Sequence, residues 1–96
     1  MSVMVLLDFD IKDGRIEEFL GILEETLPDT RAYEGCLFLK ACVYEDQNKI
    51  CLVEEWETKA HQQKYFEWRV STGLTEAVTP YVSNIVTTYM DVKQTY

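Results

Sequence analysis

The sequence predicts an α+β fold in which two helices cover one face of a four-stranded sheet. Four segments are rich in aliphatic and β-branched residues, and two longer segments between them repeat apolar residues every three or four positions. Their order is β-α-β-β-α-β, which is the ferredoxin-like arrangement. The length of 96 residues fits a single domain, residues 1–96, with a core of modest size.

The first strand and the first helix are predicted in the N-terminal third. Residues 3–10 are aliphatic on both alternating sets of positions, which is typical of a strand covered on both faces. Residues 12–14 form a turn, and residues 15–27 follow as an amphipathic helix with glutamates on its outer side. Its apolar side consists of Ile16, Phe19, Leu20, Leu23 and Leu27. Proline disfavours the helical conformation of the residue before it, so we expect the helix to end near Pro28.

The second and third strands are predicted as a hairpin. Residues 37–44 and 50–56 are strand-like, and the polar segment 45–49 joins them. An even-length turn places Lys40 opposite Glu55, a complementary charge pair on adjacent strands.

A second helix and a last strand complete the fold. Thr58 is a suitable N-cap for a helix running to about residue 71, and Gly73 is the signal for its end. A short helical turn is expected at 74–78, and residues 84–92 form the last strand. Helices on one face leave the other face of the sheet bare. Since both faces carry apolar residues, we expect a homodimer with sheets packed face to face.

Charge and hydropathy exclude several classes of partner. The net charge of −8 argues against nucleic acid and anionic membranes, because phosphates require clustered Lys and Arg. No apolar run approaches the roughly 20 residues that span a bilayer. The N-terminus has neither the basic region nor the small-residue cleavage pattern of a signal peptide, so a cytoplasmic protein is expected.

The three cysteines, Cys36, Cys42 and Cys51, have no C-x-x-C spacing of a zinc or redox site. We expect free thiols that act as small apolar residues. The predicted hairpin places Cys42 and Cys51 diagonally on one face, which leaves a disulfide between them as an open alternative.

Residues 52–69 contain the chemistry of greatest interest, because the third strand there runs into a helix with several aromatic residues. His61 is the only histidine, and histidine is the residue type whose unperturbed pKa lies nearest physiological pH. At helical spacing, His61 lies on the same sector as Tyr65 and Trp68. Glu54 and Glu55 point to opposite sides of their strand and cannot act together on one substrate atom.

The chain resembles the antibiotic biosynthesis monooxygenase family. The residues that carry the resemblance are the first strand followed by IKDGRIEEFL, the segment TRAYEGCLFL, the strand end LVEEW, and the helix elements AH and YFEWR. The resemblance extends over nearly the whole chain and implies a dimeric α/β barrel with a cavity between sheet and helices in each subunit. Several members oxidise aromatic polyketides or hydroquinones with O₂ and without metal or flavin.

The resemblance implies a monooxygenase acting on a quinol-like or polycyclic phenolic molecule, with O₂ as co-substrate and no cofactor. A deprotonated phenol can pass an electron to O₂, so the protein needs a base and an apolar cavity. We expect His61 to be the base, and Arg69 or Arg31 to stabilise the negative charge. The expected ligand contacts are Trp56, Tyr65, Trp68 and Arg31, and the expected catalytic residues are His61 and Arg69.

Other activities of the family are alternatives. Haem degradation is disfavoured because Phe66 stands near the expected position of the haem-ligating histidine, and because the first strand lacks asparagine. One histidine and dispersed carboxylates do not form a catalytic metal site. A non-catalytic small-molecule-binding dimer and an isomerase or lyase acting on a small metabolite in the same cavity both remain open.

Overall fold

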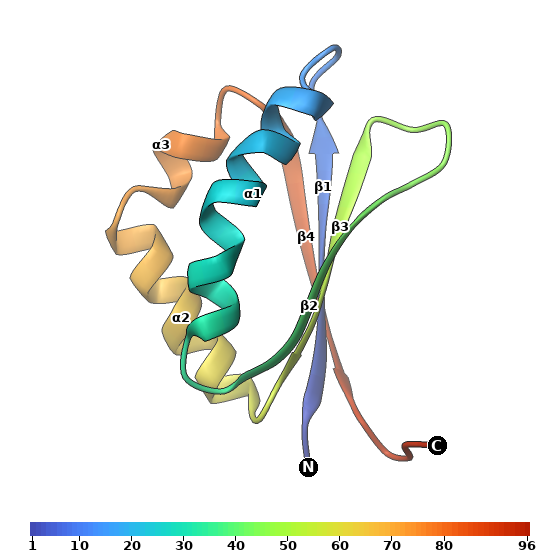
Figure 1. Cartoon of the computed structure of the whole chain (residues 1–96), viewed down its shortest axis with the longest axis vertical. Helices are drawn as coiled ribbons and strands as arrows, with labels where there is room; N and C mark the ends of the chain where they lie inside the picture. Colours follow the sequence, from blue (N-terminus) through green and yellow to red (C-terminus); the bar gives the residue numbers. More distant parts are fainter.

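A computed structural model describes all 96 residues and confirms the α+β ferredoxin-like fold. One antiparallel sheet has the strand order β2-β3-β1-β4 (Figure 1). The elements in chain order are β1 (Val3–Ile11), α1 (Ile16–Ala32), β2 (Cys36–Val43), β3 (Lys49–Trp56), α2 (Lys59–Ser71), α3 (Leu74–Val78) and β4 (Val82–Asp91). No helix has the length and apolar character needed to cross a membrane.

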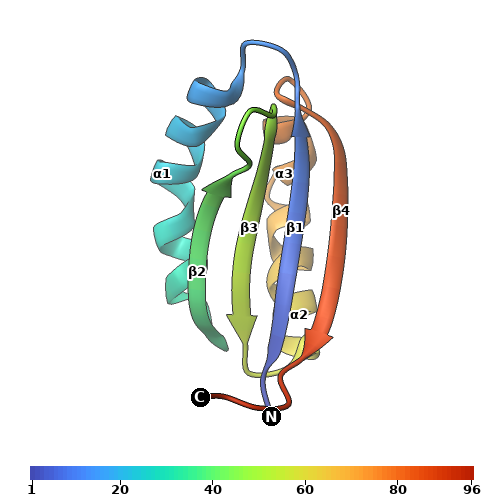
Figure 2. The same ribbon diagram turned by 90° about the vertical axis from the view of Figure 1, so that its right-hand side faces the viewer.

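All three helices lie on one side of the sheet, and the opposite side is bare (Figures 1 and 2). Along β1 the odd-numbered residues are buried beneath the helices, and the even-numbered residues on the bare face are half-buried. This alternation follows from the pleat of a strand, which points successive side chains to opposite faces.

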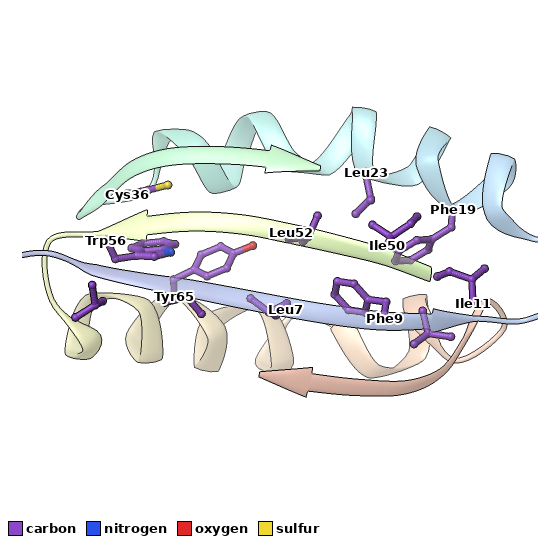
Figure 3. Packing of buried hydrophobic residues seen from close by; sticks show 13 residues of the cluster. Leu7, Phe9, Ile11, Phe19, Leu23, Cys36, Ile50, Leu52, Trp56 and Tyr65 are labelled. Carbon is purple, nitrogen blue, oxygen red and sulfur yellow. The ribbon is translucent and has the colours of Figure 1, made fainter. Parts of the chain in front are cut away.

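The core fills the space between sheet and helices (Figure 3). Phe9 of β1 meets Phe19 of α1 edge to face, with ring centroids 5.7 Å apart. At the other end of the core, Trp56 of β3 packs on Tyr65 of α2 with centroids 5.2 Å apart. Burial of such apolar area, at about 25 cal/mol per Å², is the main stabilising contribution to a domain of this size.

The predicted end of α1 near Pro28 is wrong, because the helix continues to Ala32. Pro28 lies on the exposed side, where the carbonyl of Glu24 loses its usual helical donor but remains within reach of water. The extra turn matters for the site, since it carries Thr30, which is fully buried.

The hairpin register also differs from the prediction. Lys40 pairs with Val53, and Glu55 pairs with Phe38, which is a shift of two residues. The turn spans residues 45–48 and ends one residue earlier than expected, since the Tyr44 N–H donates to the Lys49 carbonyl at 3.0 Å. A shift of two residues leaves every side chain on its predicted face.

The cysteine geometry changes with this register. Cys42 lies directly opposite Cys51, and the predicted diagonal placement is wrong. Cys36, Cys42 and Cys51 are all free thiols, and Cys36 and Cys51 are buried.

The predicted caps of α2 are confirmed. The hydroxyl of Thr58 accepts the backbone N–H of His61 at 3.1 Å, which satisfies one of the free donors of the first turn. Gly73 has φ of +105°, the left-handed conformation that glycine adopts without strain, and α3 begins immediately after it.

Candidate functional site

A cavity of about 230 Å³ lies between the sheet and the helices. Its walls come from β1, β3 and β4 on one side and from all three helices on the other. Most of the lining is apolar. The exceptions with side-chain hydrogen-bonding groups are Thr26, Thr30, Glu54, Tyr65, Arg69 and Thr72.

Glu54 is the buried carboxyl of this cavity and is only 2% exposed. It faces the helices because it alternates with Ile50, Leu52 and Trp56 along β3. The indole N–H of Trp56 donates to Glu54 Oε1 at 2.8 Å. Burial raises the pKa of Glu54 to about 7, against the lowering effect of this hydrogen bond. A carboxyl with this pKa can accept or donate a proton at neutral pH.

Arg69, Tyr65 and Thr30 form a hydrogen-bonded cluster on the helical side of the cavity. Arg69 Nε donates to the Tyr65 hydroxyl at 2.8 Å, and its Nη2 donates to Thr30 Oγ1 at 3.0 Å and to the Thr26 carbonyl at 2.8 Å. The hydroxyls of Tyr65 and Thr30 lie 2.5 Å apart. Burial raises the pKa of Tyr65, so its phenol stays protonated at neutral pH.

No carboxylate forms an ion pair with Arg69. Its guanidinium lies over the rings of Trp68, at 4.7 Å from the centroid, and Tyr65, at 5.4 Å. Tyr65 and Arg69 face the same side of α2 because they are four residues apart. The cavity therefore has a cation in its wall whose protein contacts are all neutral.

His61 does not line this cavity. It lies in the first turn of α2, 29% exposed, in a shallow surface recess, and its Nδ1 is 2.6 Å from Thr58 Oγ1. Its Nε2 is 3.8 Å from a Glu34 oxygen and 3.7 Å from a Glu57 oxygen. Gly35 packs directly beneath the ring, since a Cβ there would lie 2.5 Å from His61 Cγ.

Only two of the other predicted site residues line the cavity. Tyr65 and Arg69 line the cavity, and Trp56 is fully buried beside it as the hydrogen-bond partner of Glu54. Trp68 stacks on Tyr33 near the surface, with centroids 5.4 Å apart. Arg31 lies outside the cavity and donates to the Cys36 carbonyl at 2.8 Å.

Glu54 was not among the predicted site residues, although the sequence contains a signal for it. Positions 50, 52 and 56 are apolar, so a carboxyl at position 54 stands on the apolar face of its strand. Charged residues are rarely fully buried unless they are paired. The neighbouring Glu55 faces the other side of the sheet and gives no such signal.

No group of three or more His, Cys, Asp or Glu side chains gathers anywhere in the structure in a way that could hold a metal ion.

The family model of the antibiotic biosynthesis monooxygenases matches residues 2–79. The chain therefore belongs to this family, as the sequence resemblance indicated. No curated protein matches the sequence significantly.

Solved structures agree on the fold. A candidate antibiotic biosynthesis monooxygenase from Deinococcus radiodurans superposes with a TM-score of 0.85 at 14% identity, covering 98% of this chain and 95% of the other. Rv0793 from Mycobacterium tuberculosis gives a TM-score of 0.84 at 14% identity, covering 99% and 98%. SnoaB, a cofactor-independent oxygenase from Streptomyces nogalater, gives 0.81 at 13% identity, covering 98% and 95%. The TM-scores establish a shared fold.

Proposed function

We propose that this protein is a cofactor-independent monooxygenase that oxidises a quinol-like or phenolic molecule with O₂ in the cavity between sheet and helices. The observation that carries the proposal is the buried carboxyl of Glu54, with a pKa of about 7, in a largely apolar cavity that also has Arg69 in its wall. Membership of the monooxygenase family and the likeness to SnoaB, itself described as a cofactor-independent oxygenase, support it.

The first step in this proposal is removal of the phenolic proton by the Glu54 carboxylate. The apolar lining excludes water, so the resulting phenolate is electron-rich and weakly solvated. It passes one electron to O₂, and the two radicals combine at a hydrogen-bearing ring carbon, which is para to the hydroxyl in a simple phenol and ortho to it in a hydroquinone. Arg69 stabilises the negative charge, which lies first on the phenolate and then on superoxide.

The balance of the reaction requires no external reductant. One oxygen atom of O₂ stays on the ring carbon that was attacked, and the other leaves as water. The two hydrogens of that water come from the phenolic hydroxyl and from the attacked carbon, so a phenol and O₂ yield a quinone and water, and a hydroquinone and O₂ yield a hydroxyquinone and water. The phenol supplies all the electrons that reduce O₂.

Glu54 replaces His61 as the base in this proposal. A general base must come within about 3 Å of the proton that it removes. Glu54 lines the cavity, whereas His61 lies in the surface recess with Thr58 and Lys64. Tyr65 contributes as a neutral hydrogen-bonding wall, and Trp56 positions the base.

We also propose that the working form is a homodimer in the cytoplasm. The bare face of the sheet carries exposed apolar side chains, including Val86, 50% exposed, and Met90, 44% exposed, beside the half-buried Met4 and Leu6. Contiguous apolar surface of this kind marks interaction sites. Sedimentation equilibrium at micromolar concentration tests this, and a monomer would contradict it.

Oxygen uptake by the metal-stripped protein tests the activity. The substrates are hydroquinones and fused-ring phenols, measured against a no-protein control for autoxidation. Uptake that depends on wild-type protein and falls in Glu54→Gln supports the proposal. Product formation without oxygen consumption would point to an isomerase or lyase, and tight binding without any turnover would point to a binding protein.

A further inference from the structure

The cavity has two chemically different ends. Along the sheet, the pairing of Val5 with Glu54 marks one end, and the pairing of Phe9 with Ile50 marks the other. Four residues of strand separate these levels, which corresponds to about 13 Å at ~3.3 Å per residue. Figure 3 shows Tyr65 beside Trp56 at the first end and Phe19 beside Phe9 at the second.

The hydrogen-bonding groups gather at the Glu54 end. Trp56 contacts both Glu54 and Tyr65, because its indole N–H donates to Glu54 and its ring packs on the ring of Tyr65. Tyr65 in turn contacts Thr30 and Arg69. A ligand hydroxyl finds both a proton acceptor and a cation here.

The opposite end is lined by apolar side chains, those of Phe9, Phe19, Leu74, Ala77, Val78 and Ile85. The polar lining residue next to α3 in the chain is Thr72, whose hydroxyl already donates to the Trp68 carbonyl at 2.9 Å. A polar ligand group placed at this apolar end would lose its hydrogen bonds to water without replacement, which is unfavourable. This end of the cavity therefore favours a hydrocarbon part of the ligand.

The size of the cavity restricts the ring system. An apolar cavity of ~150 Å³ is known to hold one benzene molecule. The 230 Å³ available here accommodates one ring, or two small fused rings, together with a few further carbon atoms. Three or four fused rings exceed it.

The charge of the cavity also restricts the ligand. The charge of an ionised Glu54 is balanced by that of Arg69 in the cavity wall, so a carboxylate ligand would bring an unbalanced negative charge into the same low-dielectric space. A neutral hydroxyl can instead donate to Glu54, which satisfies the buried carboxylate.

We infer that the ligand of this cavity is a neutral phenol or hydroquinone of one or two rings that carries a short apolar chain. The hydroxyl lies at the end with Glu54 and Arg69, and the chain points toward α3. This inference rests on the proposed function and narrows its substrate class.

The test measures, by calorimetry under anaerobic conditions, how tightly the wild-type protein binds hydroquinone and its monoalkyl derivatives. The alkyl chains range from methyl to hexyl. Each methylene group that becomes buried contributes about 0.8 kcal/mol, so affinity rises about fourfold per carbon until the apolar end is filled. Anthrone, with three fused rings, is the comparison ligand and binds more weakly than the alkylated hydroquinones.

Two valine variants test where the alkyl chain of the ligand lies. Val78 lines the apolar end, so Val78→Phe fills it and abolishes the chain-length dependence while hydroquinone itself still binds. Val70 lies outside the cavity and is exposed, so Val70→Phe is the matched control that keeps the dependence. Ile85→Phe fills the same end from β4 and serves if Val78→Phe does not fold.

The failure of this inference differs from the failure of the proposed function. Hydroquinone binding with no dependence on chain length, or tighter binding of anthrone, overturns the inference and leaves the proposed function standing. Absence of binding by every phenol and hydroquinone overturns both.

Discussion

Glu54 and His61 are both ionisable residues near the junction of β3 and α2, but their surroundings differ. Glu54 is buried, faces an apolar cavity and receives one hydrogen bond from Trp56. His61 is partly exposed in a surface recess and is surrounded by the carboxylates of Glu34 and Glu57. Imidazole has the more suitable pKa in water, yet burial gives the carboxyl a comparable value of about 7.

The difference shows that position decides which group can act as a base. A carboxyl in low dielectric gains basicity because its charged form loses solvation. The histidine lies in the surface recess, and the wall of the cavity separates it from any ligand inside.

Glu54→Gln is expected to lower turnover of a quinol-like substrate by about 10²–10⁴-fold, which is the usual contribution of a general base. The amide keeps the shape and the hydrogen bond from Trp56 but cannot take a proton. Oxygen uptake measures the effect, with Glu57→Gln in the surface recess as the matched control. An equal loss of turnover in both variants would show that Glu54 is not the general base.

Arg69→Met is expected to lower turnover by roughly 10²-fold, because it removes a preorganised cation from the cavity wall. Arg31→Met is the control, since Arg31 lies outside the cavity. Initial rates at saturating substrate measure both variants. A larger loss in Arg31→Met would place the charge-stabilising group elsewhere.

The stability of the protein is expected to depend on the titration of Glu54. Its pKa rises from the ordinary 4.5 to about 7 in the folded state, so the folded protein binds an extra proton between these values. This contribution to stability is fully present below pH 4.5 and is lost as the pH rises toward 7. The loss is about 3 kcal/mol at ~1.4 kcal/mol per pH unit.

Urea unfolding at pH 5 and pH 8 measures this dependence. Other acidic residues also titrate, so the comparison is between wild type and Glu54→Gln at each pH. The variant is expected to gain stability relative to wild type at pH 8 and to show no such gain at pH 5. An equal difference at both pH values would contradict the raised pKa.

His61→Ala is expected to change turnover by about twofold or less, because the ring lies outside the cavity. The oxygen-uptake assay with the same substrate measures it beside Glu54→Gln. A loss as large as that of the Glu54 variant would restore the histidine as the base and would reverse the comparison.

The sequence by itself determined the order of elements and the face of each strand residue. Helical and strand periodicities depend on local geometry, so they were readable without tertiary contacts. For the same reason the two-residue error in the hairpin did not move any side chain to the wrong face. The caps of α2, at Thr58 and Gly73, were also local signals.

Only the tertiary structure decided which groups meet. Pro28 does not end α1, and the last turn brings Thr30 of α1 to Tyr65 and Arg69 of α2. The raised pKa of Glu54 arises from burial by elements far apart in the chain. Solvation and hydrogen bonding depend on every neighbour in space, and a single sequence does not list those neighbours.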